Sequence, residues 1–179
     1  KALICVGENQ FYQLIDSPIK KKIHHINNGI SDYLIDNLSC LDTFDSRKDI
    51  VFMGSLVPQK NFHYLAKVWQ LISCEIPTAK LHVIGSSNTY GIKSNLGKKG
   101  LAEKKYEDKF ISLLDSDPIS RKKVFFHGNL GLSKYDFLAK SRVGIVNPLG
   151  TTETCCVSAV EMQALGLPVC TGNYESLKT

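Results

Sequence analysis

The sequence lacks the marks of a membrane-spanning or secreted protein. No apolar run in its 179 residues approaches the length needed to cross a bilayer, and no signal peptide is visible. Its six cysteines show none of the paired spacings typical of zinc sites, and most lie in apolar runs. We therefore expect reduced thiols in a cytosolic protein. An initiator methionine is also missing and the sequence stops just after an expected internal strand, so we expect a fragment of a larger protein.

The composition excludes few classes of partner. A hydrophobic content of 43% and a charged content of 22% are ordinary for a soluble globular chain. The net charge of +5 is compatible with an anionic substrate or with peripheral contact with an acidic membrane surface. We expect a cytoplasmic protein, either in solution or associated with a membrane, and no nucleic-acid partner.

Apolar runs that end in glycine or a polar turn alternate with amphipathic stretches along the chain. Core strands are expected at 50–54, 80–85, 123–128, 142–147 and 167–171. The two longest helices are expected at 61–74 and 101–114. Strands that alternate with helices form a parallel sheet with right-handed connections. The expected fold class is therefore α/β, a Rossmann-like parallel sheet with helices on both faces.

The stretch that begins at Gly150 combines a polar turn, a short helix with a carboxylate and a Gly-x-Pro stop. It follows the expected strand at 142–147, and open parallel sheets bind ligands at the carboxyl ends of their strands. A helix that begins near Thr154 would direct free N–H groups there, which favours phosphate. Glu153 at the helix start and Glu161 about two turns further could accept hydrogen bonds from sugar and ribose hydroxyls. Alternatively, the first carboxylate only stabilises the helix dipole and the second is a solvated helix residue.

The same stretch resembles the E-x7-E signature of the retaining nucleotide-sugar glycosyltransferases of family 4, also called glycosyl transferases group 1. Its glutamates fall on Glu153 and Glu161, and residues 164–169 resemble the A-x-G-x-P-V that follows. The resemblance implies the C-terminal, donor-binding half of a GT-B enzyme, with a nucleoside diphosphate sugar as donor and neither a metal nor another cofactor required. It also implies that Glu153 orients the donor sugar and that Glu161 binds the ribose hydroxyls.

The loop from Gly54 to Asn61 resembles the GRLxxxKG loop of this family, in which an arginine and a lysine hold the donor diphosphate. Lys60 matches the lysine, and its place at a helix start, where it opposes the dipole, suits a bound anion between them. Alternatively, Lys60 is simply exposed. Ser55 stands where the arginine is expected, which removes a fixed charge and a bidentate donor. Either another cation substitutes, or the phosphates rest on Lys60 and backbone amides.

Two further segments complete the expected site. The loop at 128–130 resembles the F-x-G-x-(V/L) loop that contacts the nucleotide base. Cys155 and Cys156 stand where Phe-Gly is common, and a cysteine pair at a helix start could instead have a lowered pKa and a redox role. The donor-binding candidates are Gly54, Ser55, Lys60, Gly128, Asn129, Leu130, Glu153, Thr154, Cys155, Cys156 and Glu161. We expect Lys60 and Glu153 to be catalytic, with Lys60 and the amides at 154–156 stabilising the leaving diphosphate.

The first part of the chain is expected to belong to a different domain. A strand at 2–6, a helix at 8–15 and a strand at 23–30 end on an Asn-Gly turn that resembles the IxNGI/V hinge of the family. The resemblance implies that residues 1–28 are the tail of an N-terminal acceptor domain and that residues 29–179 are the nucleotide-sugar-binding domain, with its last part missing. His24 and His25 would point to opposite faces of a strand, which argues against a metal site.

The expected function is therefore retaining, hexosyltransferase-type transfer to a glycan or lipid-linked acceptor in surface glycan or polysaccharide synthesis. The acceptor would bind the missing domain, so we expect this chain alone to bind donor without transferring sugar. A non-catalytic nucleotide-binding module is one alternative, favoured by Ser55 and the cysteine pair. Another GT-B enzyme, such as a sugar-nucleotide epimerase, is the other. A phosphorylase would need a lysine for pyridoxal phosphate, and no candidate motif is present.

Overall fold

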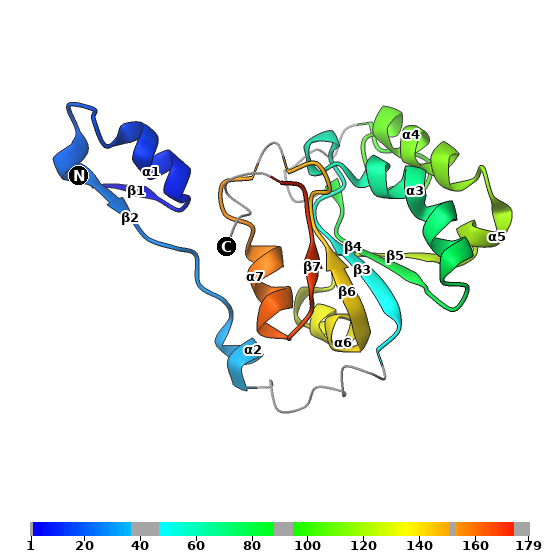
Figure 1. Cartoon of the computed structure of the whole chain (residues 1–179). Helices are drawn as coiled ribbons and strands as arrows, with labels where there is room; N and C mark the ends of the chain where they lie inside the picture. The colour runs from blue at the N-terminus through cyan, green and yellow to red at the C-terminus, as the bar shows by residue number, and fades with distance from the viewer. Residues whose placement is uncertain (1, 37–46, 88–94, 151–152, 174–179) are drawn as a thin grey trace.

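A computed structural model describes residues 2–36, 47–87, 95–150 and 153–173 (Figure 1). The strands are β1 (Leu3–Cys5), β2 (Ile23–His25), β3 (Asp49–Met53), β4 (Leu81–Ile84), β5 (Val124–Gly128), β6 (Ser141–Ile145) and β7 (Val169–Cys170). The α-helices are α1 (Glu8–Leu14), α2 (Asp32–Asp36), α3 (Phe62–Glu75), α4 (Lys104–Leu114), α5 (Pro118–Arg121), α6 (Lys134–Lys140) and α7 (Val157–Ala164). Within the described residues the short 3-10 helices are η1 (Lys20–Lys22), η4 (Pro58–Lys60) and η6 (Gly131–Ser133).

The predicted parallel sheet is present. Five strands pair in the order β5-β4-β3-β6-β7, and every neighbouring pair is parallel. Helices α3, α4 and α5 lie on one side of this sheet, and α6 and α7 lie on the other (Figure 1). The expected α/β, Rossmann-like fold class is confirmed. The strand order places β3 and β6 side by side, so the loops that follow them begin at the same edge of the sheet.

Strand β3 shows why both faces of the sheet are covered. Its side chains alternate, so Ile50 and Phe52 pack with α3 and α4, while Val51 and Met53 pack with α6 and α7. All four are almost completely buried. A continuous apolar run of this kind is typical of parallel strands that are buried on both faces. The two resulting cores hold the sheet edge rigidly beneath the loops that carry the candidate site.

The longest helices follow the predicted periodicity. Helix α3 buries Phe62, Leu65, Ala66 and Trp69 along the expected apolar face. Helix α4 begins at 104 rather than at 101, because the Glu103 side chain accepts a hydrogen bond from the backbone N–H of residue 106 and caps the helix there. The preceding loop is held by the buried carboxylate of Glu107, which accepts hydrogen bonds from the backbone N–H groups of residues 99, 101 and 102.

The first part of the chain forms a small unit of its own secondary structure. Strands β1 and β2 pair in parallel as a two-stranded sheet, and α1 lies against β2. The second strand ends at His25, earlier than predicted, and an extended connection leads to α2. No group of three or more His, Cys, Asp or Glu side chains that could hold a metal occurs within the described ranges. No helix in the described part of the chain is long and apolar enough to cross a membrane. The domain boundary at residue 28 stays a prediction.

A row of polar side chains crosses the α6 face of the sheet and should make stability depend on pH. His82 bonds through Nδ1 to His127 Nε2 (2.9 Å) and through Nε2 to Asp49 Oδ2 (3.1 Å). Burial, and then the charge of His82, lower the pKa of His127 below its ordinary 6.5. The folded chain therefore binds this proton less readily than the unfolded chain. The stability contribution is fully present above pH 6.5 and is lost as the pH falls through 6.5 toward the lowered pKa.

We therefore expect the urea midpoint to decrease between pH 7.5 and pH 5.5, and to decrease less in His127→Gln, which keeps a hydrogen-bond donor. Part of the decrease should persist in the variant, because burial also lowers the pKa of His63. Equal decreases in the two proteins, measured by urea titration at both pH values, would contradict a role for His127.

Candidate functional site

Two adjoining cavities lie at the carboxyl ends of β3 and β6. The first, of about 230 Å³, is lined by residues that include Lys60, Asn147, Glu153, Cys155 and Cys156. The second, of about 350 Å³, is lined by residues that include Asn129, Leu130, Lys134 and Glu161. Both are bordered by Met53, Gly54, Ser55 and Ser158, so they form one groove. We call it the strand-end groove below.

The structure brings most of the predicted site residues to this groove. All of the donor-binding candidates line it except Gly128 and Thr154. Gly128 ends β5 with a φ of +66°, a conformation that glycine adopts readily, and its carbonyl accepts a hydrogen bond from the N–H of Gly85 (2.8 Å). It thus shapes the turn that carries residues 129 and 130. Thr154 is exposed. The roles of these residues in binding stay predictions.

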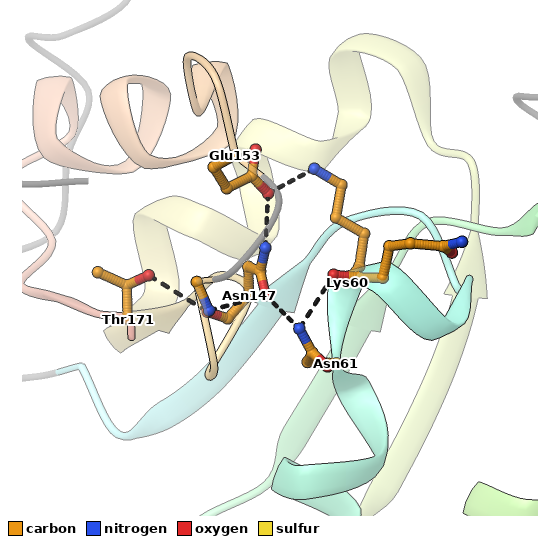
Figure 2. A network of polar contacts seen from close by, with 7 residues as sticks. Lys60, Asn61, Asn147, Glu153 and Thr171 are labelled. Atoms are coloured by element: carbon orange, nitrogen blue, oxygen red, sulfur yellow. Dashed lines mark hydrogen bonds and ion pairs between the residues drawn. The ribbon is translucent and has the colours of Figure 1, made fainter. Parts of the chain in front are cut away.

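Glu153 and Lys60 form an ion pair inside the first cavity (Figure 2). The Lys60 ammonium donates to Glu153 Oε1, which also accepts from the side-chain amide of Asn147 (3.1 Å). Glu153 is only 6% exposed, and α7 begins four residues after it. The alternatives of a first-turn acid and of a simply exposed lysine are therefore wrong. A buried carboxylate needs such partners, because an unpaired charge in a protein interior is costly.

Asn147 is the centre of this network, although its position in the sequence predicted only the end of a strand. Its Oδ1 accepts from the side-chain amide of Asn61 (2.7 Å) and from the N–H of Gly150 (3.1 Å) (Figure 2). Its carbonyl oxygen accepts from the N–H of Gly172 (3.3 Å) and from the hydroxyl of Thr171 (3.4 Å). Asn147 thereby connects the end of β6 to the segments that follow η4 and β7.

Both asparagines adopt backbone conformations that explain their identity. Asn61 has a φ of +60° and Asn147 a φ of +34°, in the left-handed region that asparagine tolerates better than most residues. Asn61 stands where the GRLxxxKG pattern has its last glycine, which is the other residue suited to this region. The usable signal in the sequence was therefore an asparagine directly after the matched lysine and another directly after a buried strand.

The predicted helix start near Thr154 is wrong. Helix α7 begins at Val157 with Cys156 as N-cap, and no side chain caps it. The side chain of Glu153 is held by its partners across the groove, so the chain runs through 153–156 in irregular conformation before it turns into the helix. Glu161 consequently lies about one turn inside the helix rather than two. The first turn still borders the groove through Val157 and Ser158.

Cys156 does not have the lowered pKa expected of a redox cysteine. Burial raises the pKa of the Cys156 thiol to about 11, and the nearby Glu153 carboxylate acts in the same direction. This thiol is therefore protonated at neutral pH, and a protonated thiol is a poor nucleophile. The alternative of a lowered pKa at this position is wrong for Cys156, whose side chain instead forms part of the groove wall.

Glu161 has its own lysine in the second cavity. Lys134 Nζ lies 2.7 Å from Oε1 and 2.9 Å from Oε2, and the hydroxyl of Tyr135 donates to Oε1 (3.0 Å). Glu161 is 7% exposed, so the alternative of a solvated helix residue is wrong. Burial first, and then the Glu161 carboxylate, raise the pKa of Tyr135 to about 12. Neither Lys134 nor Tyr135 was predicted, because nothing in the sequence shows that the start of α6 faces α7.

The fold and the groove define the chain as a Rossmann-like α/β domain with a groove at the carboxyl ends of its strands. The chain belongs to the family of glycosyl transferases group 1, whose model matches residues 41–179. A comparison with curated protein sequences gave no significant match.

Solved structures of GT-B glycosyltransferases share the fold. Anabaena Alr3699/HepE in complex with UDP and glucose has a TM-score of 0.68 at 14% identity, over 98% of this chain and 45% of its own. A glycosyltransferase from Rickettsia africae has a TM-score of 0.66 at 16% identity, over 100% of this chain and 47% of its own. WaaG, a glycosyltransferase involved in lipopolysaccharide biosynthesis, has a TM-score of 0.64 at 15% identity, over 94% of this chain and 43% of its own. The chain thus spans less than half the length of these three proteins.

Proposed function

We propose that this chain is the donor-binding part of a retaining glycosyltransferase that takes a sugar from a nucleoside diphosphate sugar. The observation that carries the proposal is the strand-end groove, which brings Lys60 and both glutamates of the E-x7-E pattern to one edge of the sheet. Family membership supports it. UDP is the first nucleotide to test, because solved structures similar to this chain were determined with UDP and glucose and with UDP and GlcNAc.

In this proposal Lys60 and Glu153 act on the part of the donor that reacts. The Lys60 ammonium has three N–H donors, so it can keep its contact with Glu153 and also donate to a phosphate oxygen. Negative charge develops on the leaving diphosphate, and a fixed cation beside it lowers the barrier. Since Ser55 replaces the expected arginine, Lys60 and the backbone amides around Cys155 and Cys156 supply this stabilisation. Glu153 accepts hydrogen bonds from the sugar hydroxyls and orients the anomeric carbon. No metal takes part.

The rest of the donor extends into the second cavity. Glu161 binds the ribose, and the backbone of Asn129 and Leu130, together with the turn at Gly128, contacts the base. The acceptor, a glycan or a lipid-linked glycan, binds an N-terminal domain of which this chain holds only the tail, residues 1–28. The whole enzyme works in the cytoplasm, in solution or at the membrane surface, in surface glycan or polysaccharide synthesis.

The test is calorimetry of the 179-residue chain with UDP, GDP and ADP. We expect one nucleotide to bind, and Lys60→Met and Glu161→Gln each to weaken it about tenfold or more, because each removes a hydrogen bond to a charged group. Lys67→Met is the matched control, since Lys67 is exposed on α3 outside the groove. Failure of all three nucleotides to bind at millimolar concentration would overturn the donor site. Sugar transfer by this chain alone would overturn the separate acceptor domain.

A non-catalytic nucleotide-binding module is the second candidate, and Ser55 favours it because the phosphate site has one cation fewer than the family pattern. Such a module binds nucleotide through the same groove, but the longer protein transfers no sugar. A sugar-nucleotide epimerase would instead release free nucleoside diphosphate without any acceptor. Assays of the longer protein with and without acceptor separate the three.

A further inference from the structure

We propose that Lys134 and Glu161 together recognise the two adjacent hydroxyls of the donor ribose. Glu161 Oε2 accepts a hydrogen bond from one hydroxyl, and the Lys134 ammonium donates a hydrogen bond to the oxygen of the other. The proposal rests on the proposed function, which places the ribose at Glu161. It makes Lys134, at the start of α6, a residue that determines specificity for ribose over deoxyribose.

The hydrogen bonds around Glu161 show what the carboxylate can still accept. A carboxylate has about four acceptor positions, two on each oxygen. Among the residues that the structure describes, Oε1 accepts from Lys134 and from Tyr135, and Oε2 accepts from Lys134 only. One acceptor position therefore remains, and it is on Oε2. Glu161 cannot accept from both ribose hydroxyls unless it gives up one of these buried contacts.

Lys134 supplies the complementary group. An ammonium has three N–H donors, and the two contacts with Glu161 leave one of them. The Lys134 side chain is 24% exposed and borders the 350 Å³ cavity together with Glu161, so a ligand in that cavity can reach it. The ion pair thus offers one acceptor and one donor side by side. Adjacent hydroxyls, each of which donates and accepts, match this pair.

The arrangement is held in place by packing rather than by the lysine alone. Tyr135 is 7% exposed, and its ring stacks on Tyr33 of α2 at a centroid distance of 5.8 Å. Its hydroxyl donates a hydrogen bond to Oε1 of Glu161. Oε2 is therefore the oxygen that can accept a hydrogen bond from a ligand. Lys134 and Glu161 lie 27 residues apart, on α6 and α7, so the ion pair also connects the base-contacting loop after β5 to the E-x7-E helix.

The test measures affinities of the 179-residue chain for UDP, 2′-deoxy-UDP, 3′-deoxy-UDP and uridine, or for the corresponding guanosine or adenosine set if that nucleotide binds. In the unmodified chain we expect each deoxy form to bind about five- to tenfold more weakly than UDP, the usual effect of one hydrogen bond to a charged group. In Lys134→Met one of the two penalties should disappear and the other should remain. In Glu161→Gln, the penalty that Lys134→Met leaves in place should become smaller than in the unmodified chain.

Controls separate recognition from folding. Lys134→Met leaves the buried Glu161 without its cation, so a double variant, Lys134→Met with Glu161→Gln, removes both charges together and should lose both penalties. Lys134→Arg keeps charge and donors and should retain both. Lys140→Met, at the exposed end of the same helix, should behave like the unmodified chain. Unfolding temperatures of all variants identify any that do not fold.

Several outcomes would overturn the proposal while leaving the proposed function intact. Lys134→Met that weakens UDP and both deoxy forms by one common factor, with uridine unaffected, would place the lysine at the phosphates. The same common factor with uridine also weakened would make its role structural. Both penalties kept in Lys134→Met would mean that Glu161 alone recognises the two hydroxyls, and both lost in that variant would mean that the lysine only holds Glu161 in position. Absence of binding by UDP, GDP and ADP would instead overturn the proposed function itself.

Discussion

Asn147→Leu should lower the free energy of unfolding by about 3 kcal/mol or more and weaken nucleotide binding by the groove. Asn147 is 2% exposed, and its side chain satisfies the amide of Asn61, the N–H of Gly150 and the carboxylate of Glu153. Leucine leaves all three without this partner in a buried place, at about 1–3 kcal/mol for each group. The positive φ at this position adds strain for an aliphatic side chain.

Asn147→Asp separates the two roles of this side chain, which accepts hydrogen bonds from Asn61 and Gly150 and donates one to Glu153. The introduced carboxyl keeps an acceptor for Asn61 and Gly150 but places a second negative charge beside Glu153, where the amide donor was. Like charges at this distance raise each other's pKa, so acidification from pH 7.5 to 5.5 should cost this variant less stability than it costs the unmodified chain or Asn147→Leu. Urea titrations at pH 7.5 and 5.5 make the comparison.

For Asn147→Leu, a loss of less than about 1 kcal/mol in the free energy of unfolding would contradict the central position of Asn147 in the network.

Phe62→Ala should lower the free energy of unfolding by about 3–5 kcal/mol. Phe62 is fully buried, and its ring lies 4.9 Å from that of Phe52 and 5.2 Å from that of Phe110, between sheet and helices. Removing the ring leaves a cavity among α3, α4 and β3. These elements are packed against other parts of the core, so they cannot move together to fill it. The first residue of α3 follows Asn61 directly, so the change should also loosen η4 and lower nucleotide affinity.

Leu71→Ala is the matched control on the same helix, because Leu71 is 67% exposed and its truncation should cost less than about 1 kcal/mol. Urea denaturation with an unchanged m-value in both variants measures the difference in stability directly. Similar midpoints for the two variants would contradict the packing of α3 described above.

The sheet could be predicted well from the sequence because each strand and helix shows its own pattern of apolar residues. The run from Ile50 to Met53 is apolar at every position, which is typical of a strand buried on both faces, and the spacing of Phe62, Leu65 and Trp69 defines one helix face. The predicted parallel sheet also implied that the site residues lie close together, since the loops that follow parallel strands share one edge of the sheet. The family pattern then placed Lys60, Glu153 and Glu161 at that edge.

The partners of those residues could not be predicted in the same way. Lys60 and Glu153 are 93 residues apart, and only the packing of β3 beside β6 brings them together. The start of α7 was misplaced because the residues before it are good caps, whereas the actual N-cap is Cys156 with no side-chain bond. Tertiary contacts of Glu153 keep the chain out of helix over that stretch, and such contacts override local preference.

The two lysine–glutamate pairs have a consequence for the rate at which a ligand arrives. Each lysine lies against its own carboxylate, so the four charges in the groove nearly cancel at distances beyond the screening length of about 8 Å at physiological ionic strength. An approaching anion therefore gains little long-range attraction from these four charges, so any effect of salt on its encounter rate arises from the rest of the chain, whose net charge is +5. Differences in affinity among ligands then arise mostly after arrival, in how slowly each one leaves.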